Sequence, residues 1–118
     1  YGEGRAQKPA QAADRLVLLL RCALWAPSIT VRLAVLHRLC VLMHAVETPG
    51  ATRRWAWVPE ETMLALRSCR DLRLLVPASE LLLLCLHCRY GWVPCDELEN
   101  FCLHLRDVCG SHAASLCL

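Results

Sequence analysis

The chain has 118 residues, of which 56% are hydrophobic, and a formal net charge of +2. A chain of this length fits one domain that buries about two-thirds of the surface its unfolded form exposes. Charged residues make up only 20% of the sequence and leucine fills 24 positions, so the composition excludes a disordered or polybasic tail. The small net charge does not by itself indicate nucleic acid or an anionic membrane as a partner.

Apolar residues recur at helical spacing in five segments, and no stretch alternates with the period of a strand. Five of the six prolines stand just before such a segment, which suits a residue preorganised for the first turn of a helix. The expected helices cover residues 10–25, 28–46, 60–76, 79–90 and 95–109, and a short last piece covers 111–118. We therefore predict an all-α fold of five to six antiparallel helices, either a helical bundle or a short α-helical repeat segment (α-α superhelix).

The expected domain organisation is a polar segment over residues 1–9 followed by a single all-α helical domain over 10–118. The helix over 79–90 contains the longest apolar run, residues 81–86, and is expected to be the most central. Six apolar residues are far fewer than the roughly 20 that a spanning helix needs, so we expect no transmembrane segment. Since the sequence does not start with Met, a fragment of a larger protein is one interpretation.

A Trp-x-Pro unit occurs three times, beginning at Trp25, Trp57 and Trp92, at separations of 32 and 35 residues. Spacings in the thirties are typical of stacked helical hairpins. In this respect the chain resembles α-helical repeat families such as the tetratricopeptide, pentatricopeptide, HEAT and armadillo arrays. The resemblance concerns architecture only and implies no functional residues.

The nine cysteines lie within apolar helical stretches rather than in loops, which indicates buried thiols instead of a disulfide framework. We therefore expect a reducing intracellular compartment, either cytoplasm or nucleus. Cys95, Cys102 and Cys109 are expected to line a helix contact, since a spacing of seven keeps them on one face. Cys85 and Cys88 leave a zinc-stabilised domain open as an alternative, although we expect no metal and no cofactor.

Basic and aromatic residues supply the candidate binding site. Two arginines precede two tryptophans in one expected loop, and three more arginines recur at three-residue spacing along one expected helix. The candidate partner-binding residues are Arg53, Arg54, Trp55, Trp57, Arg67, Arg70 and Arg73. Arginine and tryptophan are enriched at the energetic centres of protein interfaces.

The sequence therefore favours a non-catalytic helical protein–protein interaction module or scaffold segment, in a hetero-complex or a homo-oligomer. A nucleic-acid-binding helical repeat that uses the arginines on phosphates is the alternative.

Overall fold

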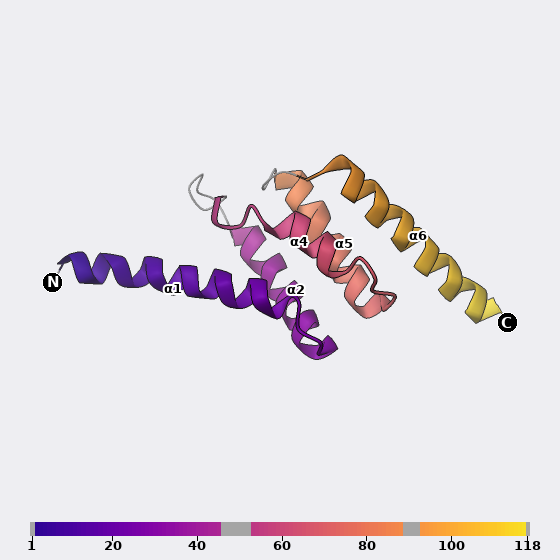
Figure 1. Ribbon diagram of the computed structural model, residues 1–118, viewed down its shortest axis with the longest axis horizontal. Coiled ribbons are helices and arrows are strands. Elements are labelled where there is room, and N and C mark those ends of the chain that lie inside the picture. The colour runs from indigo at the N-terminus through magenta and orange to yellow at the C-terminus, as the bar shows by residue number, and fades with distance from the viewer. Residues whose placement is uncertain (1, 46–52, 89–92, 118) are drawn as a thin grey trace.

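The computed structural model describes the backbone of residues 2–45, 53–88 and 93–117 and the side chains of residues 11–45, 53–87 and 93–116. Over these residues the chain is all-α, with five helices and no strand, so the predicted fold class is confirmed (Figure 1). The helices are α1 (Gly2–Ala23), α2 (Ile29–Ala45), α4 (Val58–Ala65), α5 (Leu72–Cys88) and α6 (Cys95–Cys117).

Helix α5 is the centre of the packing, because it contacts α2, α4 and α6 and shares its largest contact with α2. This agrees with the expectation that the leucine-rich segment is the most central. The hydrophobic core consists of side chains that are at most 7% exposed, and α5 supplies six of them. The α5 members are Leu74, Leu75, Ala78, Leu81, Leu82 and Cys85.

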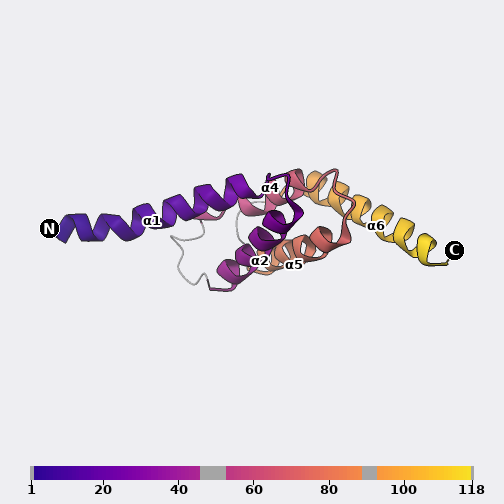
Figure 2. The same cartoon turned by 90° about the horizontal axis from the view of Figure 1, so that it is seen from below.

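The molecule is elongated, with principal extents of 67 × 28 × 19 Å and a radius of gyration of 16.3 Å. A compact chain of this length has a radius of gyration of about 13.5 Å. The radius of gyration is larger than this because the N-terminal part of α1 and the C-terminal part of α6 project from opposite ends of the molecule (Figures 1 and 2). No described helix is both long and apolar enough to cross a lipid bilayer.

Three prolines mark helix starts as predicted. Pro27 and Ser28 precede α2, and the Ser28 hydroxyl accepts a hydrogen bond from the N–H of Val31 at 3.4 Å. Pro59 lies in the first turn of α4, and Pro94 directly precedes α6. At these positions the missing proline N–H removes no intrahelical hydrogen bond.

The single helix predicted over residues 60–76 is wrong, because α4 ends at Ala65 and α5 begins at Leu72. The Asp71 carboxylate accepts a hydrogen bond from the N–H of Arg73 at 3.0 Å, which caps the new helix. Apolar spacing continues across this break, so periodicity alone could not reveal it.

Three other predicted boundaries are also absent. Pro9 lies inside α1 and Pro77 lies inside α5 instead of opening a helix, and Gly110 lies inside α6 instead of ending it. Gly110 has no left-handed φ, and a Cβ added there would meet no atom within 4 Å, so neither backbone conformation nor space requires glycine at this position. At the other end, α1 begins at Gly2 and includes the backbone of the predicted polar segment.

Most described cysteines are not in the core, contrary to the prediction. Only Cys85 is buried, and Cys40 and Cys69 are half-buried. The exposed thiols are those of Cys22, Cys95, Cys102 and Cys109. Helix α6 buries Phe101 and Val108, and Cys102 and Cys109 each lie about a quarter-turn away from the buried residue before them.

Candidate functional site

The two tryptophans of the predicted binding loop face inward. Trp55 is 6% exposed and belongs to the core, while Trp57 is half-buried beside it with 6.3 Å between ring centroids. The guanidinium of Arg21 lies 5.6 Å from the centroid of the Trp57 ring. The contact of Arg21 with Trp57 therefore joins α1 to the residue that precedes α4, and neither tryptophan is an exposed side chain.

The arginines before these tryptophans differ in environment. Arg53 is exposed, whereas Arg54 forms an ion pair with Asp14 of α1 at 3.3 Å. Of these two arginines, Arg54 therefore has a carboxylate partner, and the positive charge available to a binding partner is mainly that of Arg53.

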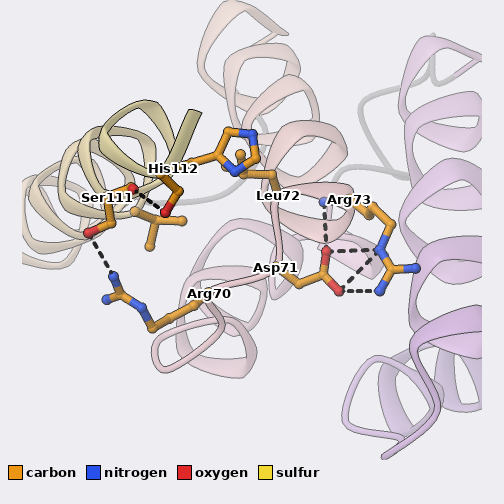
Figure 3. Close-up of a pocket in the computed structure, with 8 residues that line it drawn as sticks. Arg70, Asp71, Leu72, Arg73, Ser111 and His112 are labelled. Carbon is orange, nitrogen blue, oxygen red and sulfur yellow. Dashed lines mark hydrogen bonds and ion pairs between the residues drawn. The ribbon is translucent and has the colours of Figure 1, made fainter. Parts of the chain in front are cut away.

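Arg67, Arg70 and Arg73 do not form the helical stripe that we predicted. Arg67 and Arg70 lie in the connection between α4 and α5, and only Arg73 is in a helix. Arg70 forms an ion pair with Asp107 of α6 at 2.9 Å and donates a hydrogen bond to Ser111 (Figure 3). The break at Asp71 separates these side chains.

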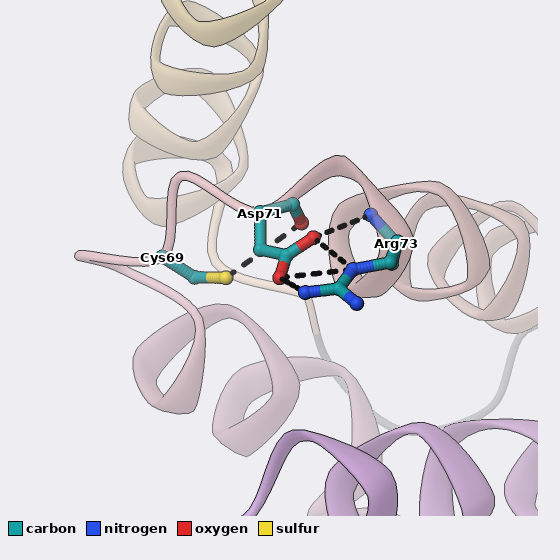
Figure 4. Close-up of polar contacts among 3 residues, drawn as sticks. All are labelled: Cys69, Asp71 and Arg73. Carbon is teal, nitrogen blue, oxygen red and sulfur yellow. Dashed lines mark hydrogen bonds and ion pairs between the residues drawn. The ribbon is translucent and has the colours of Figure 1, made fainter.

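Arg73 is compensated by its near neighbour. Its guanidinium pairs with the Asp71 carboxylate at 2.7 Å, and the Cys69 thiol donates to the Asp71 main-chain oxygen at 3.8 Å (Figure 4). Hydrogen bonding to Arg73 lowers the pKa of Asp71 below its ordinary value, and the same contact raises the pKa of Arg73. The pair stays ionised over the whole neutral range.

The open hollow around these residues brings together polar groups from α6 and the start of α5. Figure 3 shows that the Arg70 side chain extends toward Ser111, while Arg73 extends away from His112. The two guanidinium groups therefore do not converge on one ligand position. Each already has a carboxylate partner, so this hollow makes a poor anion site.

The zinc alternative finds no ligand set in the part of the chain that the structure describes. There, no three His, Cys, Asp or Glu side chains gather in a way that could hold a metal ion. Cys85 is buried in the core, and the side chain of Cys88 lies outside the described residues.

An apolar groove between α5 and α6 is the clearest candidate site, and the sequence did not single it out. It has a volume of about 240 Å³, and Ser79 supplies its one hydroxyl. Its other lining residues are Leu82, Leu83, Leu86, Leu98, Phe101, Cys102 and Leu105. Leu83 is 66% exposed and Leu86 is 42% exposed, so two large aliphatic side chains of the central helix face solvent here.

The groove exists because α5 is apolar around most of its circumference, apart from a polar stripe at Arg73, Glu80 and His87, and its neighbours cover only part of the apolar surface. Helix α2 covers one side of α5, while α6 crosses another and runs in the opposite direction (Figure 1). The sequence feature that could have predicted the groove was the continuous apolar run over residues 81–86. A helical stretch that is apolar all round needs neighbours on all sides.

Comparisons with protein-family models, with curated proteins and with solved structures find no match to this chain. The function is therefore argued from the chain's own residues.

Proposed function

We propose that this chain is a non-catalytic helical module that binds an apolar helix of another protein chain in the groove between α5 and α6. The observation that carries the proposal is that two exposed and two half-buried leucines cluster at a preformed apolar hollow. Leu83 and Leu86 contribute from α5, and Leu98 and Leu105 contribute from α6. A contiguous apolar surface of this kind is favourable to cover and costs stability in water when left bare.

The shape of the groove fits a helix better than a small molecule. Its walls are two antiparallel helices, and its lining offers almost no hydrogen-bonding groups that could orient a polar ligand. An amphipathic helix laid between two helices supplies apolar side chains every three or four residues, which match side chains with the same spacing on the groove walls.

We also propose a reducing intracellular compartment, cytoplasm or nucleus. The thiols of Cys22, Cys95, Cys102 and Cys109 are free and exposed. Exposed thiols of this number persist in compartments where glutathione and thioredoxin keep them reduced.

The nucleic-acid alternative draws less support from the candidate arginines. Arg54, Arg70 and Arg73 are each paired with a carboxylate, which reduces the charge available for phosphates. Protein binding through the apolar groove is therefore the preferred function.

Capture of bound proteins from cells by a tagged chain tests the proposal. Leu83→Glu places a charge in the groove, while Leu103→Glu places the same charge at a 54% exposed leucine that does not line it. We expect Leu83→Glu to lose captured proteins that the wild type and Leu103→Glu retain. An identical captured set for all three chains would refute the proposed function.

A further inference from the structure

Helix α6 carries a heptad pattern that includes three residues of the groove wall, Leu98, Cys102 and Leu105. Cys95, Leu98, Cys102, Leu105 and Cys109 alternate at spacings of three and four residues. The three cysteines are exposed and the two leucines are half-buried. The seam extends over about 21 Å at 1.5 Å per residue. Leu98 and Leu105 pack partly on the chain's own core, and the exposed remainder of a seam with this spacing suits packing against another helix along its length.

The two flanks of this seam differ sharply. On the inner flank, Phe101 and Val108 are 5% and 3% exposed, because they pack into the chain's own core. On the outer flank, Glu99 and Arg106 are exposed and make no ion pair within the described part of the chain. One flank is therefore apolar and already covered, and the other carries one acid and one base seven residues apart.

This asymmetry discriminates between the two orientations of a paired α6. In a parallel pair the outer flank of one helix meets the inner flank of the other, so Glu99 and Arg106 would face Phe101 and Val108. In an antiparallel pair the outer flanks lie on the same side. Glu99 of each copy then lies beside Arg106 of the other, giving two opposite-charge contacts by symmetry.

We infer that the helix that fills the groove is α6 of a second copy of this chain, bound antiparallel about a two-fold axis that passes close to Cys102. The inference rests on the proposed function, since it names the partner of the same groove. Leu83 and Leu86 of each copy contact α6 of the other. The two α5–α6 pairs together form a four-helix bundle whose core is the two grooves.

Sedimentation velocity on the full chain, from micromolar to several hundred micromolar, tests the self-association. We expect a species of twice the 13.3 kDa monomer mass. Glu99→Arg or Arg106→Glu turns two attractive contacts into repulsive ones and should weaken the dimer about tenfold at low salt. The double variant restores opposite charges and should recover the wild-type affinity.

Glu60→Arg is the matched control, because Glu60 is an exposed acid on α4, away from the groove. It should leave the dimer unchanged, and circular dichroism should show equal helix content in every variant. A wild-type chain that stays monomeric at the highest concentration would overturn the inference, as would a double variant no better than the single ones.

The orientation is tested by a short bismaleimide that joins thiols close to one another. The antiparallel arrangement predicts links between Cys95 of one copy and Cys109 of the other, identified by mass spectrometry of the cross-linked peptides. Links from Cys95 to Cys95, or from Cys109 to Cys109, would overturn it. A failure here leaves the effect of Leu83→Glu on captured proteins intact, so it is distinguishable from a failure of the proposed function.

Discussion

Arg32 of α2 stabilises the junction of three helices, and its replacement gives a specific stability prediction. Its guanidinium donates to the main-chain oxygen of Leu24 at 3.0 Å and to that of Ala65. Leu24 follows the last residue of α1, and Ala65 is the last residue of α4. Carbonyls at helix C-termini lack an intrahelical amide partner and carry partial negative charge, so one cation here satisfies two helix ends.

The magnitude follows from the number and kind of these bonds. A hydrogen bond that involves a charged group contributes about 1.5–3 kcal/mol, and the partial exposure of Arg32 places each near the lower end. We therefore expect Arg32→Met to lower the free energy of unfolding by about 3 kcal/mol. Arg32→Lys should cost roughly half of this, since one ammonium group cannot reach both carbonyls with the geometry of the guanidinium fork.

Urea unfolding followed by circular dichroism measures the effect, and Arg38→Met is the matched control because Arg38 is an exposed arginine on the same helix. A loss of about 3 kcal/mol corresponds to a thermal midpoint lowered by roughly 12 °C in a chain of this size. Equal stability of Arg32→Met and Arg38→Met would refute the bridging role of Arg32.

Two further predictions concern buried and half-buried polar groups. The Thr62 hydroxyl is buried without a hydrogen-bond partner among the described residues, so Thr62→Val should raise the free energy of unfolding by about 1 kcal/mol, and a lower urea midpoint would contradict this. Burial, and next the charge of Glu80, raise the pKa of the Cys40 thiol, so alkylation of Cys40 should be slower than that of Cys109 at neutral pH. Removing the charge in Glu80→Gln should lower the pKa of Cys40 and increase its alkylation rate at neutral pH. An unchanged pH profile of Cys40 alkylation in Glu80→Gln would show that the charge of Glu80 does not raise this pKa.

The fold class followed from apolar spacing and proline positions, because both act locally. Pro27, Pro59 and Pro94 mark helix starts where the chain needs no N–H donor. The helix break at Asp71 was not predicted, because the capping role of Asp71 depends on backbone geometry and the apolar spacing around it continues without a break. The predictions at Pro77 and Gly110 were wrong because the surrounding helix continues despite a local cost of about 3 kcal/mol for proline and about 1 kcal/mol for glycine.

The binding surface was harder to predict than the helices, since exposure depends on where other helices lie. Leu83 and Leu86 could not be distinguished from the buried Leu81 and Leu82 within one apolar run. Trp55 illustrates the opposite error, because an aromatic beside arginines looked like a surface contact and is part of the core. The heptad spacing of the α6 cysteines was visible in the sequence, but only the structure shows that these thiols face solvent.

The central claim, that another helix covers the groove between α5 and α6, is tested most directly by the alkylation rate of Cys102 as the concentration of the chain increases. Cys102 lines the groove, whereas Cys22 is an exposed thiol on α1 outside it. We predict that Cys102 reacts as readily as Cys22 in dilute solution and becomes protected as the chain associates, while Cys22 stays reactive. Equal rates for both thiols at concentrations where sedimentation shows association would contradict the claim.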